Sequence, residues 1–239
     1  MKKYIAPLIL LLGFASAYTQ GNLPATGGVS NNIIGNSAFA EAYDNTGKPL
    51  TATNKEVLGS PFLNENWGKG EVRLRNGFLL KNAELQFDVY GNELHFRKDN
   101  IAYKFVDSIK EFSIEFKEEE QTQSVFFRSG YPPIEKKYTP AFYQVLADGR
   151  KIQLLKYVSK EIREKYNYLG PVAKEYQLTV SYYIYDVSAG IIKAIKPGKE
   201  ALIKAMPLYE KSISLFSKKK DYKFKSENEI KELFIALNE

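Results

Sequence analysis

Histidine and cysteine, two side chains that often carry out catalysis, are nearly absent from this chain of 239 residues. It has one histidine and no cysteine, which excludes a cysteine nucleophile, a thiolate metal site and any metal site built from several histidines. In the alternating segment 93–97, Leu94 and Phe96 take the buried face. We therefore expect the side chain of His95 to point into solvent, where it is poorly placed to serve a Ser-His-Asp triad.

Other catalytic motifs are incomplete. Ser217 and Lys220 have the Ser-x-x-Lys spacing, but they lie in a run of lysines where that spacing arises easily. Gly68-x-Gly70 lacks the third glycine of a dinucleotide-binding loop. Two carboxylates alone can hydrolyse a glycosidic bond, and this alternative stays open because no sequence spacing defines such a pair. We predict no catalytic residue, no cofactor and no metal, and we favour a protein that is not an enzyme.

Aromatic side chains supply the candidate ligand-binding residues, which are Trp67, Tyr183 and Tyr185. In a strand, Tyr183 and Tyr185 share one face, whereas Tyr182 and Ile184 share the other. Tyrosine and tryptophan combine a large flat surface with a polar group, which suits carbohydrate or peptide ligands. The alternative for all of them is packing, since tyrosine is common in half-buried strands.

A cluster of lysines near the C-terminus is the second candidate binding feature. Residues 190–225 contain ten lysines and three acidic residues, a balance of 10 − 3 = +7. The densest part consists of Lys218, Lys219, Lys220, Lys223 and Lys225. Such a cluster can bind acidic lipid headgroups or an anionic polysaccharide. The alternative is a solvated helix end, where lysines are favoured by the helix dipole.

The first 17 residues have the pattern of a secretory signal peptide. Lys2 and Lys3 precede an apolar stretch over residues 5–14, and Ala15–Ala17 forms an A-x-A cleavage site. We therefore predict an exported protein, located in the periplasm, on the outer membrane or outside the cell. Cleavage would lower the net charge from +6 to 32 − 28 = +4, which is too small to favour nucleic-acid binding. We expect no transmembrane span in the mature chain.

The composition divides the rest of the chain into three parts. Residues 18–60 are rich in small and polar residues, which predicts a linker arm; the LPxTG-like Leu23–Gly27 within it is interpreted as a coincidence. Residues 61–189 alternate apolar and polar side chains between turn dipeptides such as Asn76-Gly77 and Asp99-Asn100, which predicts an antiparallel meander. Within it, residues 159–175 are polar and basic and are expected to form a loop with at most one helical turn.

Residues 190–239 change to a helical period. An apolar stripe spaced four, three, four and three residues predicts two short helices, the second beginning near Pro207. The stripe consists of Leu202, Met206, Tyr209, Ile213 and Phe216. Ser226 and Glu229 have the spacing of a capping box and predict the start of a last helix. These helices are too short to be stable alone, so we expect them to pack against the sheet.

The motifs between these elements resemble those of a known family. They include the segment Gly59–Gly70, the turn at Asn76-Gly77, the strand Phe142–Leu146 and the helix start at Glu227–Leu233. From about residue 59 to the end, the chain resembles a family of exported Bacteroidota-type proteins to which no activity is assigned. The resemblance implies export and a strand-rich body with a helical tail, and it implies no site residue.

Together these observations predict an α+β fold: a mainly antiparallel β-meander, as a curved sheet or a partly closed barrel, with short C-terminal helices packed on it. The predicted function is a non-enzymatic binding or structural accessory role in the cell envelope, with an envelope polymer or an envelope protein as partner. A carboxylate-dependent hydrolase acting on envelope or extracellular polymers is one alternative. Binding of an anionic surface through the C-terminal lysines is another.

Overall fold

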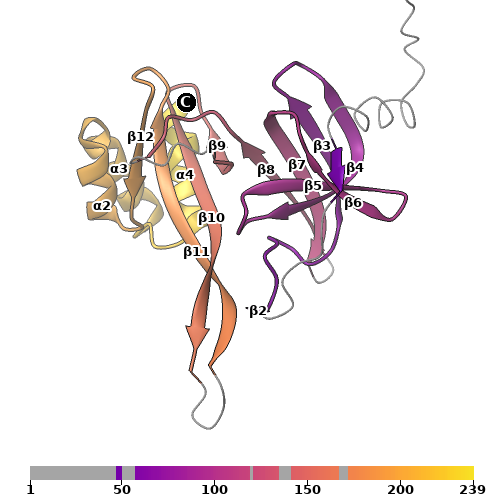
Figure 1. Ribbon diagram of the computed structural model, residues 1–239. Coiled ribbons are helices and arrows are strands. Elements are labelled where there is room, and N and C mark those ends of the chain that lie inside the picture. The colour runs from indigo at the N-terminus through magenta and orange to yellow at the C-terminus, as the bar shows by residue number, and fades with distance from the viewer. Residues whose placement is uncertain (1–46, 50–56, 119–120, 135–140, 167–171) are drawn as a thin grey trace, which may run out of the picture. The chain divides into compact units, whose positions relative to one another are not determined.

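The computed structural model describes residues 47–49, 57–118, 121–134, 141–166 and 172–239 (Figure 1). All of them belong to the second of two compact units, Ile34–Glu239. The predicted signal peptide and the LPxTG-like segment lie outside the described residues, as does most of the predicted linker arm.

The described strands form one sheet, which confirms the predicted α+β class with a mainly antiparallel meander. Its order is β1-β6-β5-β4-β3-β7-β8-β9-β10-β11-β12, and every pair along this path is antiparallel. The path is open, and β2 adds a parallel pair on β11. The strands are β1 (Gly47–Pro49), β2 (Val57–Leu58), β3 (Gly68–Leu74), β4 (Leu79–Asp88), β5 (Glu93–Lys98), β6 (Ile101–Phe105), β7 (Ile109–Glu118), β8 (Gln121–Arg128), β9 (Tyr143–Asp148), β10 (Ile152–Lys165), β11 (Ala173–Asp186) and β12 (Ile191–Ile195).

The hairpin turns of the first strands are where the sequence predicts them. Gly77 has a φ of 94° between β3 and β4. Asp99 and Asn100 have φ values of 50° and 62° between β5 and β6. Two consecutive positive φ values match the right-handed twist of the flanking strands, and asparagine and aspartate adopt them more easily than most residues.

A first hydrophobic core lies on the β3–β8 part of the sheet. Its centre is a group of phenylalanine rings: Phe87 lies 5.3 Å from Phe112, 4.9 Å from Phe127 and 5.9 Å from Phe142, measured between ring centroids. The first three come from β4, β7 and β8, and Phe142 directly precedes β9. The alternating burial of these strands thus produces a common apolar face.

A second hydrophobic core forms between β9–β12 and the C-terminal helices. Helix α2 (Lys199–Ala205), the 3₁₀ turn η1 (Pro207–Tyr209), α3 (Glu210–Lys220) and α4 (Glu227–Asn238) follow β12. Helix α4 packs against β9 and β10, and α2 packs against β12 (Figure 1). The break at Pro207 confirms the predicted pair of helices. No helix in the described part of the chain is long and apolar enough to cross a membrane.

Helix α4 begins as the sequence predicts. The Ser226 hydroxyl accepts a hydrogen bond from the Glu229 amide at 3.3 Å, which satisfies one of the free amides at the helix start. Its predicted apolar face is buried and consists of Ile230, Leu233, Phe234 and Leu237. These side chains join the second core, as expected for a short helix that needs a surface to pack on.

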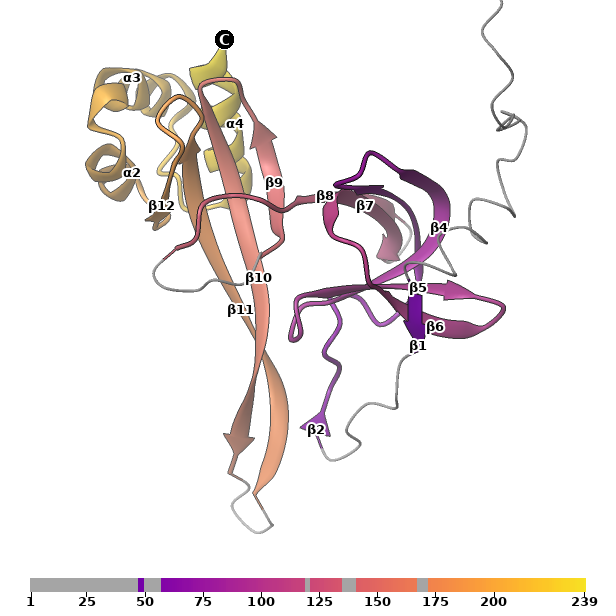
Figure 2. The ribbon, with the colours of Figure 1, turned by 45° about the horizontal axis from the view of Figure 1, so that its top comes forward.

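The loop predicted over residues 159–175 is wrong. Strand β10 runs to Lys165 and β11 begins at Ala173, and the two pair from Ile152↔Asp186 to Lys165↔Ala173. Figure 2 shows them continuing together beyond β9 and β12. Toward this end most of their side chains are exposed on both faces, so the sequence shows no alternation that would reveal a strand.

The two parts of the sheet meet at a narrow joint between β8 and β9. Only Phe127↔Gln144 and Arg128↔Tyr143 pair there. Arg128 strengthens the joint: its guanidinium donates to both Asp148 oxygens, at 2.9 and 3.0 Å, and to Glu111 at 3.1 Å. Two parallel hydrogen bonds to one carboxylate fix its orientation.

Candidate functional site

His95 is buried, so the prediction that it points into solvent is wrong. It does lie on the face opposite Leu94 and Phe96, but the segment before β3 covers that face. The Phe62 ring stands edge-on to the imidazole at 5.6 Å, and only 4 % of His95 is exposed. Gln86 holds the segment in place by donating to the carbonyl oxygens of Asn64 and Glu65, at 3.3 and 2.9 Å. No local pattern reveals a covering segment of this kind.

Neither ring nitrogen of His95 has a hydrogen-bond partner among the described residues. Nε2 lies 3.8 Å from a carboxylate oxygen of Glu93, which is beyond hydrogen-bond distance. Burial lowers the pKa of His95 below its usual 6.5, although the charges of Asp88 and Glu93 oppose this effect. The neutral imidazole is therefore the form that the fold accommodates.

This burial predicts that the protein loses stability in mild acid. The pKa of His95 is lower in the folded protein than in the unfolded chain, so below about pH 6.5 the unfolded chain binds more protons than the folded protein. The free energy of unfolding therefore falls as the pH decreases, by at most about 1.4 kcal/mol per pH unit. Urea unfolding between about pH 7.5 and 5.5 measures the effect, because ordinary carboxyl groups titrate lower. His95→Phe keeps the ring packing, and we expect it to remove the dependence. An unchanged slope in His95→Phe would contradict this assignment.

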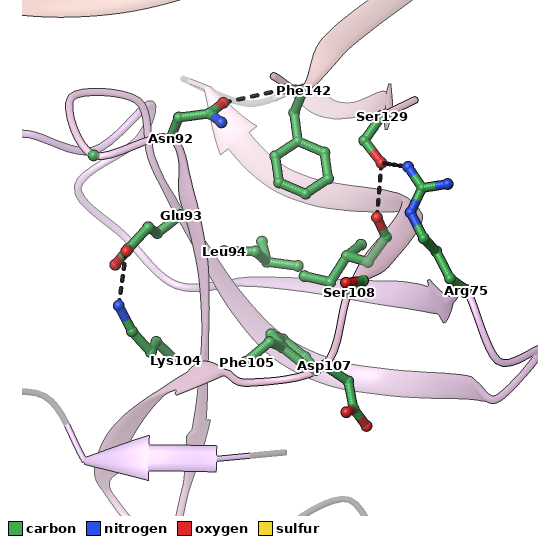
Figure 3. A pocket seen from close by; sticks show the side chains of 12 residues that line it. Arg75, Asn92, Glu93, Leu94, Lys104, Phe105, Asp107, Ser108, Ser129 and Phe142 are labelled. Atoms are coloured by element: carbon green, nitrogen blue, oxygen red, sulfur yellow. Dashed lines mark hydrogen bonds and ion pairs between the residues drawn. The ribbon is translucent and has the colours of Figure 1, made fainter. Parts of the chain in front are cut away.

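A cavity with both apolar and charged lining lies where the first core approaches the β8–β9 joint. It has a volume of about 270 Å³. Leu94, Phe105, Ile109 and Phe142 supply its apolar lining. Figure 3 shows the Phe142 ring pointing into it between Asn92 and Ser129. The Asn92 side-chain oxygen accepts a 3.2 Å hydrogen bond from the Phe142 amide, which holds the backbone of this ring in place.

Arg75 lies at one end of this cavity. Its guanidinium donates to the Ser129 hydroxyl at 3.0 Å, and that hydroxyl donates to the Ile109 carbonyl oxygen at 2.7 Å. Gly130 leaves room for the guanidinium, because a Cβ at this position would lie 2.8 Å from an Arg75 nitrogen. The ion pairs of arginines within the described residues involve Arg73, Arg97, Arg128 and Arg163, so Arg75 has no carboxylate partner there.

The opposite end of the cavity carries an ion pair. Lys104 donates to Glu93 at 2.7 Å, which neutralises both side chains. Asp107 also lines the cavity, but Figure 3 shows its carboxylate turned away from that of Glu93. A carboxylate-dependent hydrolase needs two carboxylates that flank one bond. The arrangement of Glu93 and Asp107 does not favour that chemistry.

Trp67 lies in a different groove, of about 470 Å³. Phe116, Lys69, Lys117 and Thr122 also line it. The guanidinium of Arg97 lies 5.2 Å from the Trp67 ring centroid, a cation–π contact. Trp67 is thus half-buried and held by Arg97, and its role in binding a ligand stays a prediction.

Tyr183 and Tyr185 share one face of β11, as predicted, and pack there against other tyrosines. Tyr183 stands edge-on to Tyr143 at 5.6 Å, and Tyr185 stands edge-on to Tyr131 at 5.1 Å. Tyr143 also contacts Tyr157 and Tyr131, both at 5.5 Å. Burial raises the pKa of Tyr131 and of Tyr143 to about 12. These contacts explain the positions of Tyr183 and Tyr185 by packing, and neither residue lines the cavity of Arg75.

The other face of β11 also matches its prediction. Ile184 is buried in the second core, and the Tyr182 hydroxyl donates to Glu227 of α4 at 2.8 Å. The same carboxylate forms an ion pair with Lys156 of β10 at 2.8 Å. Tyr182 therefore helps to attach the last helix to the sheet.

One of the five lysines of the predicted C-terminal cluster forms an ion pair. Lys220 pairs with Glu232 of α4 at 3.7 Å. Lys218 and Lys219 are exposed on α3, and Lys223 and Lys225 are exposed in the segment that follows it. These four lysines form no ion pair with a described residue, and the role of the cluster in binding an anionic surface stays a prediction.

Comparisons with protein-family models, with curated proteins and with solved structures give no match to this chain. The resemblance to exported Bacteroidota-type proteins therefore stays a prediction. Within the described residues, no three acidic or histidine side chains gather in a way that would hold a metal ion.

Proposed function

We propose that this chain is an exported, non-enzymatic binding protein of the cell envelope, and that the cavity beside Arg75 takes a small molecule with a carboxylate group and a short apolar body. The N-terminal export pattern supports the location. One observation carries the ligand class: a guanidinium without a carboxylate partner among the described residues stands at the end of an apolar cavity.

The charges of the cavity support a carboxylate rather than an amine. Glu93 is already neutralised by Lys104, whereas Arg75 donates only to a neutral hydroxyl in its described side-chain contacts. A guanidinium has five N–H donors and binds carboxylates through two parallel hydrogen bonds. Asp107 is the other charged side chain of the lining, and Figure 3 shows its carboxylate pointing away from Arg75 and Phe142. A ligand carboxylate at Arg75 would therefore meet a positive charge that has no carboxylate partner among the described residues.

The volume and the lining support a short apolar body. Ligand cavities usually measure ~300–1,000 Å³, so a cavity of about 270 Å³ favours a small ligand. Leu94, Phe105 and Phe142 offer it apolar contacts, while Ser129 fixes the guanidinium at one end.

Titration of the isotope-labelled chain with hexanoate, followed by NMR, tests this proposal. We expect shifts at the cavity residues, and we expect Arg75→Gln to weaken binding about tenfold or more, since a charge-assisted hydrogen bond is lost. Arg150→Gln is the matched control, because Arg150 is exposed and lies outside the cavity. Hexanamide, which keeps the apolar body without the charge, should bind more weakly than hexanoate.

Two results would overturn the proposal. Equal binding of hexanoate to the wild type and to Arg75→Gln would remove Arg75 as the carboxylate partner. Absence of shifts at the cavity residues with hexanoate would reject the ligand class.

A further inference from the structure

The exposed side of η1 and α3 has an unusual combination of side chains. Leu208 is 95 % exposed and Leu215 is 70 % exposed. Residues seven positions apart lie on the same side of a helical segment, two turns from each other. Ile213 and Ser217 are buried on the inner side of α3, so Leu215 belongs to its outer side. Leu208 precedes α3 in η1, and its exposure shows that it points into solvent as well. Large apolar side chains that gather on a surface indicate an interaction site.

Three lysines flank these leucines. Lys211, Lys218 and Lys219 are exposed on α3, and none of them forms an ion pair with a described residue. From the helical period, they lie on either side of Leu215 on the outer side of the helix. We call Leu208, Leu215 and these three lysines the leucine–lysine face.

The apolar surface continues on both sides of this face. One hollow, of about 200 Å³, is lined by Leu208 together with Ile191 and Met206. Another, of about 430 Å³, is lined by Leu215 together with Phe216 and Lys219. Tyr209 lines both hollows.

We propose that the leucine–lysine face docks this protein onto a lipid membrane that carries acidic headgroups. Charge complementarity selects this partner: unpaired lysines attract anionic lipids, and each lysine near such a surface strengthens binding about fivefold. The leucines enter the boundary between headgroups and acyl chains, as apolar side chains of surface-bound helices do. The inference goes beyond the proposed function, because it uses none of the residues of the Arg75 cavity.

The structure also distinguishes the lysines that can contact the membrane from those that cannot. Lys220 pairs with Glu232, so its charge is compensated. Lys211 lies outside the cluster at residues 218–225, yet it is exposed on the same helix as Lys218 and Lys219. Lys223 and Lys225 lie beyond the end of α3 at Lys220. The docking charge therefore comes from Lys211, Lys218 and Lys219, and removal of any one of these should weaken binding more than removal of Lys223 or Lys225.

The absence of cysteine from the chain permits a local test. A polarity-sensitive fluorophore is attached to the full chain through Leu208→Cys or Leu215→Cys, and vesicles of phosphatidylcholine with or without phosphatidylglycerol are added. We expect a blue shift and brighter emission with the acidic vesicles only. The same label at Leu178→Cys is the control, because Leu178 is 55 % exposed on β11, away from the helices.

The lysines are tested in the labelled chain. We expect the combined substitutions Lys211→Gln, Lys218→Gln and Lys219→Gln to weaken binding to acidic vesicles about 100-fold. The triple Lys81→Gln, Lys110→Gln and Lys174→Gln removes the same charge from other exposed positions and should have a much smaller effect. If the true partner were an acidic protein, the emission of the fluorophore would not change with any of the vesicles.

Several outcomes would overturn the proposal. One is that the fluorophore at positions 208 and 215 shows no blue shift with acidic vesicles. Another is that vesicles without acidic lipid give the same shift. A third is that the two lysine triples weaken binding equally. A loss of hexanoate binding in Arg75→Gln with an unchanged vesicle response would separate the two proposals.

Discussion

Gly70→Ala is expected to lower the free energy of unfolding by about 3 kcal/mol or more. A Cβ at this position would overlap the Ser113 carbonyl oxygen of β7 and would lie 2.6 Å from the Leu85 Cδ1 of β4. The first is backbone within the sheet, and Leu85 is fully buried, so neither can move without disturbing its own packing. Chemical denaturation followed by circular dichroism measures the loss.

Gly77→Ala is the matched control for this prediction. Gly77 has a φ of 94°, but a Cβ there would meet no atom within 4 Å. We expect a loss of about 1–2 kcal/mol, from the unfavourable backbone conformation alone. If the two variants lost the same free energy, the close approach of β3 to its neighbours would not be the reason for glycine at position 70.

Phe87→Ala is expected to cost about 3–5 kcal/mol, because it leaves a cavity in the first core. The Phe87 ring is 2 % exposed and contacts the rings of Phe112, Phe127 and Phe142. These neighbours come from three separate segments and cannot all move inward to fill the space. The midpoint of urea unfolding should fall accordingly, as measured by fluorescence or circular dichroism.

Phe126→Ala provides the comparison for Phe87→Ala. Phe126 is half-buried, and its ring lies 5.1 Å from the guanidinium carbon of Arg128. We expect it to lose about 1 kcal/mol, since a cation–π contact near the surface contributes little. Phe87→Leu should restore part of the stability by filling some of the cavity. A loss in Phe126→Ala as large as that in Phe87→Ala would contradict the assignment of the core.

Local signals explain which elements the sequence predicts well. Asn76-Gly77 and Asp99-Asn100 determine turn geometry with two residues, because few residues adopt a positive φ easily. The last helix is predicted by the cap at Ser226 together with four apolar residues on one face. In these cases the physical cause lies within a few consecutive residues.

Features that depend on contacts between distant segments cannot be predicted from local sequence patterns. The far end of β10 and β11 forms strands by backbone pairing, although it has no common buried face. His95 is buried because a segment some thirty residues earlier, around Phe62, crosses over it. The residues that line the Arg75 cavity come from several separate segments, so no sequence motif reveals it. They lie directly after β3, in β5 and β6, around the start of β7, and directly after β8 and before β9.

The narrow joint between β8 and β9 has a consequence for the order of folding. The first core is formed almost wholly by residues 72–127, and the second by residues 146–237. Each core is therefore built from strands that are close in sequence, and its formation closes shorter loops than it would if strands of both halves alternated in the sheet. Shorter loops lower the entropic cost of forming each core. A chain synthesised from its N-terminus can assemble most of the first core before the second exists. Phe142 and Val158, which also belong to the first core, can join it only later.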